Sequence, residues 1–413
     1  MTWSTPSPRQ VLRRFVFGFL MVQVAAVASL MTATKVRKML RGKGTRPLPR
    51  VEPRTFSVGE SNEANVYVSG APLYEDMLAA IEQAHQRVLF ESYIVKDDEM
   101  GRRFKRALNE AAARGVEVYV IYDGFANLVV KPSFFRFAPS VQVMRYPVLA
   151  SGLRFWNPRN YGRDHRKILV VDDDIAFVGG YNVGRLYEDE WRDTHLALSG
   201  TAVWDLENAF VDFWNVHRPK ERIEQVTRPT WDPEIRAHRN VPRQLIFPIR
   251  GMYLEAIDRA QKTIELTTAY FIPDADILDA LIDASRREVQ VRILLPRVSN
   301  HVIADFLARG YFNRLLDAGV EIWRYSDHMV HAKTATIDGE WSTIGTANID
   351  RLSLTGNYEI NIEIIDEGFA RGMRAVFADD AAKAELLTAE AWHRRATVGR
   401  LYEWVLKPLK PLL

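Results

Sequence analysis

One pattern of residues occurs twice in this 413-residue chain with the same internal spacing. In each copy a histidine is followed two positions later by a lysine and five positions after that by an aspartate: His165, Lys167 and Asp172, then His331, Lys333 and Asp338. An asparagine and an acid also recur 17 and 28 positions beyond each histidine: Asn182 and Asp193, then Asn348 and Glu359 (182 − 165, 193 − 165, 348 − 331, 359 − 331). A lone His-x-Lys pair is weak evidence. Several functional positions repeated at equal spacing indicate two fused copies of one domain.

The segments around the motifs repeat as well, in the order helix, strand, helix, strand. The phrase AIEQA at 80–84 has a counterpart in AIDRA at 256–260. This order is typical of the α/β class, so we expect two similar domains, each a mixed β-sheet flanked by helices, related by a pseudo-twofold axis. The expected elements are helix 74–85, strand 88–94, helix 101–114 and strand 116–122, then helix 253–261, strand 263–272, helix 277–287 and strand 289–295.

The N-terminal region contains an almost uncharged apolar stretch from Phe15 to Thr34. A helix of ~20 such residues crosses the hydrocarbon layer of a bilayer. The alternative is a cleaved signal peptide, because Ala26-Val27-Ala28 resembles a cleavage site. We favour an anchor, because the apolar stretch continues past that site and a basic cluster follows it. Cations flank the stretch, three before and six after: Arg9, Arg13 and Arg14, then Lys35, Arg37, Lys38, Arg41, Lys43 and Arg46.

This charge imbalance predicts a single N-terminal span in the cell (inner) membrane, with the larger part of the chain in the cytoplasm. Proline- and arginine-rich composition marks connectors beyond the span and between the two halves. The predicted divisions are a membrane anchor with a basic connector at 1–50, a first domain at 51–217, an inter-domain connector at 218–243 and a second domain at 244–413.

The residues that follow each histidine favour a strand, and side chains on a strand alternate between its faces. His165 and Lys167 therefore share a face, as do His331 and Lys333. Glycines at 179, 180 and 345 let the backbone approach closely just before the two asparagines, whose amides could then donate to an anion.

These groups suit displacement at a phosphodiester. One neutral imidazole attacks phosphorus and forms a phosphohistidine, while the other, protonated, gives its proton to the departing alcohol. An unperturbed histidine pKa of about 6.5 makes both states accessible near neutral pH. The lysines and asparagines would stabilise charge on the non-bridging oxygens, and Asp193 and Glu359 would each orient one imidazole through its second nitrogen. A second alcohol or water then completes the exchange.

The candidate site is thus a catalytic set, two phosphate-binding amides and two histidine-orienting acids: His165, Lys167, Asp172, His331, Lys333 and Asp338; Asn182 and Asn348; Asp193 and Glu359. For Asp172 and Asp338 a role in turns and framework is the favoured interpretation, because aspartate prefers turns and Asp338 precedes a glycine. A lysine beside each histidine would repel a metal ion, so we expect no metal and no cofactor.

The composition of the chain excludes some classes of function. The chain has no cysteine, which excludes disulfides and thiolate nucleophiles. Its formal net charge of +3 is small for the length and gives no large footprint for nucleic acid. The segment 153–163 interleaves aromatic residues with arginines and could stack on bases or lie among lipid headgroups. The run 401–413 could lie at a membrane interface or pack on the last domain.

The duplicated His-x-Lys-x4-Asp motif resembles that of the phospholipase D superfamily, and the nearest resemblance is to bacterial cardiolipin synthases. Three further segments carry it: Asp164-His165-Arg166-Lys167 with Gly179-Gly180-Tyr181-Asn182, Trp191-Arg192-Asp193-Thr194-His195, and Tyr270-Phe271-Ile272-Pro273. The resemblance covers nearly everything from about residue 65 onward. It departs at Thr346, where serine is usual, and at Leu352-Ser353, where Arg-Ser is expected.

This resemblance implies a metal-independent phosphatidyl transfer in which two phosphatidylglycerols give cardiolipin and glycerol. It also implies two phospholipase D-like domains that share a central cleft, with His165 as nucleophile and His331 as general acid, although the symmetry of the motif leaves the order of these two roles open. The partners expected are a phospholipid substrate and a membrane, with no nucleic acid. Hydrolysis of phospholipid to phosphatidic acid and a nuclease are the alternatives, and the sequence leaves the acceptor alcohol and the oligomeric state open.

Overall fold

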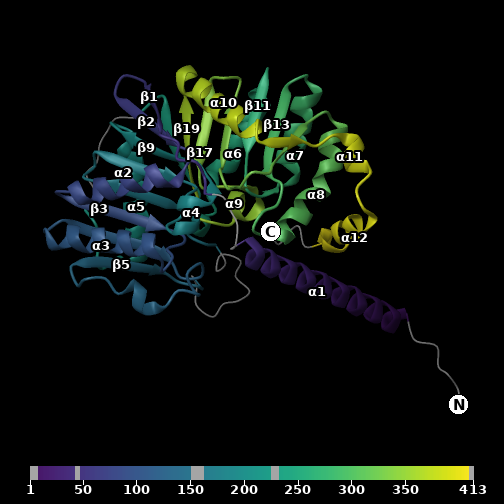
Figure 1. Ribbon diagram of the computed structural model, residues 1–413, viewed down its shortest axis with the longest axis horizontal. Helices are drawn as coiled ribbons and strands as arrows, with labels where there is room; N and C mark the ends of the chain where they lie inside the picture. The colour runs from purple at the N-terminus through teal and green to yellow at the C-terminus, as the bar shows by residue number, and fades with distance from the viewer. Residues whose placement is uncertain (1–7, 42–46, 150–161, 225–231, 409–413) are drawn as a thin grey trace, which may run out of the picture.

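The computed structural model describes residues 8–41, 47–149, 162–224 and 232–408. Within them the chain forms two eight-stranded mixed sheets that lie side by side, one from each half (Figure 1). The first sheet has the strand order β1-β2-β9-β7-β6-β3-β4-β5 and the second has the order β10-β19-β17-β16-β11-β13-β14-β20.

The first sheet is parallel on one side and antiparallel on the other, because β3, β4 and β5 run parallel while β6, β7, β9, β2 and β1 alternate in direction. Its strands are β1 (Arg54–Val58), β2 (Asn62–Tyr67), β3 (Arg87–Ser92), β4 (Glu117–Asp123), β5 (Val141–Tyr146), β6 (Lys167–Val171), β7 (Ile175–Gly179) and β9 (His195–Ser199).

The second sheet repeats this arrangement. Its strands are β10 (Ile235–Arg239), β11 (Thr263–Thr267), β13 (Gln290–Pro296), β14 (Glu321–Tyr325), β16 (Thr334–Ile337), β17 (Trp341–Gly345), β19 (Ile360–Ile365) and β20 (Ala384–Leu386). Six consecutive strands follow one order in both sheets, since β9-β7-β6-β3-β4-β5 corresponds to β19-β17-β16-β11-β13-β14. The expectation of two similar α/β domains is confirmed.

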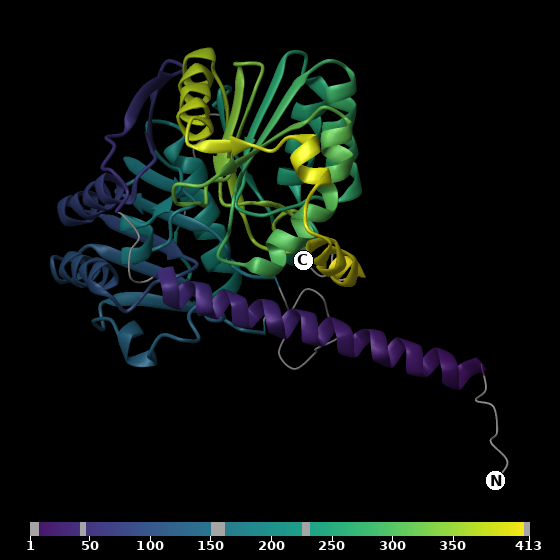
Figure 2. The same ribbon diagram turned by 45° about the vertical axis from the view of Figure 1, so that its right-hand side comes forward.

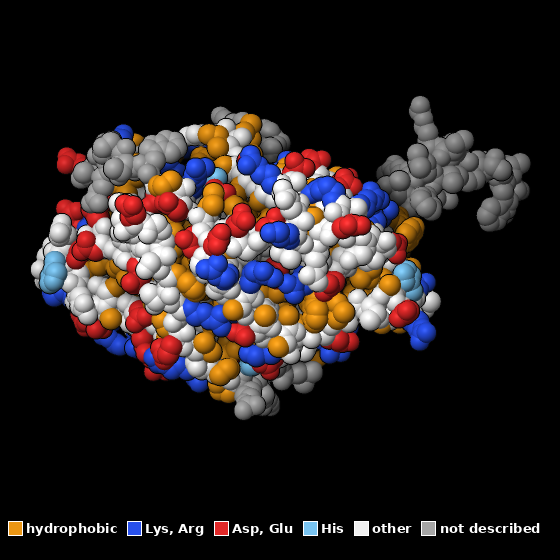
Figure 3. All heavy atoms as spheres, turned by 90° about the horizontal axis from the view of Figure 1, so that it is seen from above, with side chains coloured by type: hydrophobic (Ala, Val, Ile, Leu, Met, Phe, Trp, Pro, Cys, Tyr) orange, Lys and Arg blue, Asp and Glu red, His pale blue; other side chains and the backbone are white. Residues whose placement is uncertain are grey.

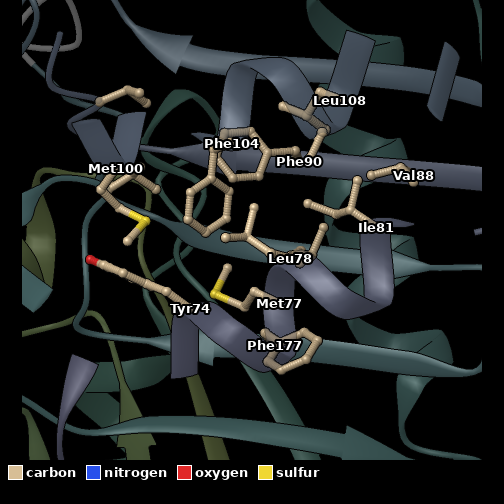
Figure 4. Packing of buried hydrophobic residues seen from close by; sticks show 14 of the residues in the cluster. Tyr74, Met77, Leu78, Ile81, Val88, Phe90, Met100, Phe104, Leu108 and Phe177 are labelled. Carbon is tan, nitrogen blue, oxygen red and sulfur yellow. The ribbon is translucent and has the colours of Figure 1, made fainter. Parts of the chain in front are cut away.

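Helices cover both faces of the two sheets. In the first half α2 (Gly70–Gln83) and α3 (Glu99–Ala113) pack apolar side chains on β3 and β4. Figure 4 shows part of this cluster, with side chains from α2, α3, β3 and β7. Alternation along the strands sends Val88 and Phe90 to this face and Leu89 to the other. The remaining long helices are α5 (Val203–His217) in the first half and α6 (Pro248–Arg259), α7 (Ala275–Arg286), α8 (Val302–Asp317) and α10 (Glu367–Ala381) in the second.

The inner faces of the two halves share one apolar core. It contains Leu89 and Val178 of the first sheet together with Ile344 and Ile362 of the second, all at most 1% exposed. Because the halves bury these side chains against each other, their relative position is fixed by packing.

Part of the expected connector 218–243 belongs to the second sheet. Strand β10 pairs antiparallel with β19 from Ile235↔Ile364 to Arg239↔Ile360. The expectation of a connector does not hold for Ile235–Arg239, because these residues form a short edge strand of which only Ile235 is fully buried.

Several short elements lie near the boundary between the halves: α4 (Arg185–Asp189), β8 (Trp191–Arg192), β12 (Phe271–Ile272), β15 (Met329–Val330), β18 (Ile349–Asp350) and α9 (Arg351–Thr355). The ends of the chain add α1 (Pro8–Arg41), α11 (Ala389–His393) and α12 (Thr397–Leu406). Helix α1 contains one segment, Phe17–Val36, long and apolar enough to cross a membrane. It runs past α12 and projects beyond the body of the protein (Figures 1 and 2).

Candidate active site

Both motif histidines line a single cavity of about 360 Å³ between the halves. His165 reaches it from the segment before β6, and His331 from the segment before β16. The two imidazoles, which lie 166 positions apart in the chain (331 − 165), therefore face one space. Each side chain is largely enclosed, with 13% of His165 and 6% of His331 exposed.

Each imidazole is held by a carboxylate from the opposite half. His165 Nδ1 lies 2.9 Å from Glu359 Oε2, and His331 Nδ1 lies 2.5 Å from Asp193 Oδ2. Both carboxylates are completely buried. With Nδ1 occupied, Nε2 is the nitrogen of each ring that remains for chemistry in the cavity.

The crossed pairing follows from backbone contacts between the halves. Strand β15 pairs parallel with β8, and the His331 amide donates to the Arg192 carbonyl at 2.6 Å. In the other direction the His165 amide donates to the Tyr358 carbonyl at 3.0 Å. Each histidine is thus held beside the residue that precedes its partner acid, so neither half contains a complete site.

The motif lysines are buried beside their own histidines. Lys167 Nζ donates to the His165 carbonyl at 2.5 Å, and Lys333 Nζ donates to the His331 carbonyl. Burial lowers the pKa of Lys167 to about 7 and that of Lys333 to about 8. An anion bound between them would favour the charged ammonium forms.

The two carboxylates differ in their electrostatic state. Burial raises the pKa of Glu359 to about 8. Burial acts in the same direction on Asp193, but the charge of Lys333 and the hydrogen bond from His331 outweigh it and hold the pKa of Asp193 below its usual value. Asp193 is therefore ionised at neutral pH, whereas Glu359 carries less negative charge.

Burial and the neighbouring lysines lower the pKa of both imidazoles. For His165 the lysines are Lys167 and Lys333, so charges from both halves act on one ring. The free site therefore favours neutral imidazoles. A bound phosphodiester anion would offset the lysine charges and would thereby stabilise a proton on one ring.

The two asparagines also line the cavity. Asn182 Oδ1 accepts from the Ile94 amide at 3.0 Å, which leaves its Nδ2 as the group able to donate to an anion. Asn348 occupies the equivalent place on the segment from the second half, 17 positions after His331.

The motif aspartates do not join these groups. The Asp172 carboxylate accepts from the amides of residues 85, 86 and 87 at 2.7–2.8 Å, and Asp338 accepts from those of residues 261, 262 and 263 at 2.8 Å. Both have positive φ angles, 53° and 55°, in the turns after β6 and β16. Their inclusion in the catalytic set is corrected by these contacts: each fixes the start of the neighbouring strand β3 or β11, as the turn and framework interpretation expects.

Gly180 is required by the approach of Asp193. A Cβ at position 180 would lie 2.0 Å from Asp193 Oδ1. The equivalent position of the second half is Thr346, whose hydroxyl donates to Glu359 Oε2 at 2.5 Å. The two acids therefore sit in different surroundings although their spacing from the motif is the same.

Aromatic side chains pack on both imidazoles, and sequence reasoning did not assign them this role. Tyr93 meets the His165 ring edge-on at 4.7 Å between centroids, and Trp191 lies 4.9 Å from the His331 ring. Position 93 directly follows the first strand of the α/β unit, where polar groups commonly face a site, and this was the available signal. The lining of the cavity also includes the apolar side chains of Ile272, Ile303 and Leu352.

Two segments singled out in the sequence lie partly outside the residues that the structure describes. Within the aromatic and arginine segment 153–163, residues 153–161 lie outside the described part of the chain. Within 401–413, residues 409–413 lie outside it, and the rest includes most of α12. In the described residues no group of three or more histidines and acids is arranged to hold a metal ion.

Comparison with known families gives a match over both halves. A family model described as "Cardiolipin synthase, PLD-like domain" matches residues 77–214 and 253–381. The cardiolipin synthase of Listeria welshimeri is 32% identical over 368 residues, covering 86% of this chain and 76% of that protein. That of Clostridium perfringens is 30% identical over 374 residues, covering 86% and 78%.

The fold also resembles a solved enzyme structure. The crystal structure of phosphatidylserine synthase from Haemophilus influenzae Rd KW20 matches with a TM-score of 0.65, covering 87% of this chain and 95% of that chain. At 14% sequence identity this likeness is one of fold.

Proposed function

This chain belongs to the cardiolipin synthase family of phospholipase D-like proteins, and from that membership we propose that it joins two phosphatidylglycerols into cardiolipin and releases glycerol. The observation that carries the proposal is the single cavity into which both imidazoles project, each tied through Nδ1 to a carboxylate of the other half. Two oriented imidazoles on one space can serve as nucleophile and acid at one phosphorus.

In the first step His165 Nε2 attacks the phosphorus of one phosphatidylglycerol. The Nε2–P bond forms, the bond from phosphorus to the glycerol headgroup oxygen breaks, and His331 gives its proton to that oxygen. In the second step a headgroup hydroxyl of another phosphatidylglycerol attacks phosphorus, the Nε2–P bond breaks, and His331 takes the hydroxyl proton. Lys167, Lys333 and the two asparagines stabilise the charge on the non-bridging oxygens throughout.

The different states of the two carboxylates support this order of roles. Ionised Asp193 favours a proton on His331, as a general acid requires. Glu359, with its raised pKa, gives less support to a cation on His165, so that imidazole stays neutral and nucleophilic. The apolar side chains in the cavity lining suit lipid acyl chains near the headgroups.

The proposal is tested by incubating the detergent-solubilised full-length protein with radiolabelled phosphatidylglycerol and a chelator. Cardiolipin and glycerol should appear in equal amounts, and denaturation at alkaline pH should trap an acid-labile radiolabelled phosphoprotein in the wild-type protein but none in His165→Ala. Phosphatidic acid as the sole lipid product, or a strict metal requirement, would contradict the proposal. DNA cleavage without lipid turnover would select a nuclease instead. On the face shown in Figure 3 cationic and anionic side chains are interspersed, which gives that alternative no support there.

We also propose that α1 holds the protein in the cell (inner) membrane with both domains in the cytoplasm. Six cations after the apolar stretch against three before it support this orientation. Because the chain has no cysteine, a single cysteine introduced at the exposed position Val129 can report the side. In intact cells it should resist a membrane-impermeant maleimide and react only after lysis. Labelling of intact cells would reverse the orientation.

A further inference from the structure

Helix α1 is docked on the protein along one stripe. Within the part of α1 whose side chains are described, the buried and half-buried positions recur at helical spacing, and the rest of that surface is largely exposed. The stripe faces α8 and α12, and Leu30 is 6% exposed in a cluster with Val302, Leu307 and Leu406. The stripe consists of Phe19, Gln23, Ala26, Val27, Leu30, Ala33 and Thr34.

The contacts with α12 lie inside the segment that could span a membrane. Gln23 Nε2 donates to the Val405 carbonyl at 3.1 Å, and this bond is buried. The Ser29 hydroxyl lies 3.1 Å from the Tyr402 hydroxyl, and the Phe19 and Trp404 rings meet edge-on at 5.5 Å. These α1 residues all fall within Phe17–Val36. A membrane that contains this segment would therefore also contact α12.

The outer side of α12 has the composition of a membrane-interface helix. Leu401 is 59% exposed and Trp404 is 61% exposed. Exposed cations at Arg400 and Lys407 suit anionic headgroups. The acid of this helix, Glu403, is neutralised by Arg395, whose guanidinium donates to both its carboxylate oxygens at 2.9 and 3.2 Å.

The same apolar cluster reaches the active site. Ile272 is 3% exposed and belongs to the cluster of Leu30 and Leu406, and it also lines the catalytic cavity. Ile303, at the start of α8, does the same. Side chains of the cavity lining therefore belong to the apolar cluster on which α1 and α12 pack.

We propose that α12 is a second membrane contact, which enters the surface of a bilayer containing anionic phospholipid together with α1, and that the pair holds the mouth of the catalytic cavity at that surface. Holding the mouth of the cavity at the bilayer surface would deliver lipid substrate to the site, and only this part of the proposal rests on the proposed function. The contact of α12 with lipid stands independently of any turnover.

The lipid contact is tested on the full chain with single cysteines, since the native sequence has none. Trp404→Cys carries an environment-sensitive fluorophore, and Leu386→Cys on β20, 41% exposed, is the matched control. The labelled proteins are reconstituted in phosphatidylglycerol vesicles that contain nitroxide-labelled lipid. We expect at least threefold stronger quenching at position 404 than at 386.

Equal quenching at the two positions with the chain bound to vesicles would overturn the proposal. The proposal would also be overturned if the fluorescence at position 404 changed with protein concentration but not with the amount of nitroxide-labelled lipid. A second copy of the chain, and not lipid, would then cover α12. The same measurement with His331→Ala should give the same quenching, since this readout does not need an active enzyme.

Delivery of substrate is tested by the ratio of two activities. Trp404→Asp should lower turnover of phosphatidylglycerol in vesicles about tenfold relative to turnover of a water-soluble, short-chain phosphatidylglycerol, and Leu386→Asp should leave this ratio unchanged. An equal ratio in the Trp404→Asp and wild-type proteins would refute delivery. If the wild-type protein converts neither substrate, the proposed function fails, whereas the quenching result still decides the contact.

Discussion

The two halves of the site are built alike but are backed by different chemistry. Behind His165 the first half buries charge: Arg166 donates to Glu91 at 2.5 Å and to Asp164 at 3.3 Å, and all three are at most 3% exposed. The equivalent positions of the second half carry no charge: Thr267, Val330 and Ala332. Val330 and Ala332 instead join an apolar cluster with Phe377.

The duplication could have kept both the groups of the site and the residues behind them identical in the two halves. The parts that touch the phosphodiester are repeated, whereas the support behind them has diverged. The orienting acids diverge in the same sense, because Glu359 has a hydroxyl partner in Thr346 and Asp193 lies against Gly180. We therefore expect equal dependence on the two histidines and unequal dependence on everything that supports them.

The largest effect should come from the histidines and should be the same in both halves. His165→Ala and His331→Ala should each lower kcat by at least ~10⁴-fold, because nucleophile and acid act as one unit. Steady-state turnover of labelled phosphatidylglycerol measures this, and circular dichroism checks the fold.

An activated substrate then distinguishes the halves. A nitrophenyl phosphodiester has a leaving group that needs no proton. His331→Ala should therefore release nitrophenolate at much of the wild-type rate, whereas His165→Ala should not. Recovery in His165→Ala alone would reverse the two roles. Near-normal activity of either variant on lipid would refute the shared site.

The orienting acids should be the next most sensitive and should differ. Asp193→Asn removes an ionised group from His331 and should cost ~10³-fold or more in kcat/KM. Glu359→Gln replaces an acid whose pKa is raised to about 8, so at pH 7 less charge is lost and the cost should be ~10- to 100-fold. Measured at pH 9, where Glu359 is ionised in the wild type, the gap between the variants should narrow. Equal losses at both pH values would contradict the assigned charge states.

The sequence predicted the repeated groups well because the chemistry fixes their spacing. Both histidines, lysines and asparagines line or adjoin one cavity, and the helices and strands expected over 74–122 and 253–295 occur in the predicted succession. The paired spacing of 28 positions also indicated that Asp193 and Glu359 orient imidazoles.

The sequence could not predict which acid serves which histidine. That depends on the two-residue pairing of β8 with β15 and on the contact of His165 with Tyr358, and neither leaves a periodic pattern. It also could not decide between catalysis and framework for Asp172, because a turn aspartate and a site aspartate look alike until the three amides it binds are known.

The buried charges behind His165 should affect stability more than activity. Arg166→Met leaves Glu91 and Asp164 buried without their cation and should lower the free energy of unfolding by ~3–5 kcal/mol. Urea unfolding measures the change. Ala332→Met at the equivalent position inserts the same side chain without stranding a charge and should cost less, about 1–3 kcal/mol.

A triple variant sharpens this comparison. Glu91→Thr, Asp164→Val and Arg166→Met together give the first half an uncharged backing like that of the second, and should recover about half of the loss. If the triple variant is no more stable than Arg166→Met alone, stranded charge is not the cause of the destabilisation.

The lysines should give the two halves different pH limits. Burial lowers the pKa of an ammonium, so the free site loses positive charge as the pH rises through about 7 for Lys167 and about 8 for Lys333. kcat/KM should therefore fall above pH ~7, about tenfold per pH unit. The limb in kcat should lie at higher pH, because the bound phosphodiester anion favours the ammonium forms. Lys167→Arg, which stays charged, should move the kcat/KM limb up by about one unit, and an unmoved limb would exclude Lys167 as its source.

The smallest effect should come from the hydroxyl that only the second half supplies. The Thr346 hydroxyl donates to Glu359 Oε2 and accepts from the Ile360 amide at 2.9 Å. Thr346→Val keeps the shape and removes a donor that favours the ionised carboxylate, so the pKa of Glu359 should rise further and kcat/KM at pH 7 should fall about three- to tenfold. Thr346→Ser keeps the hydroxyl and should stay within about twofold of wild type. If valine and serine behave alike, the hydroxyl does not tune Glu359, and the unequal surroundings of the two acids must then act through burial alone.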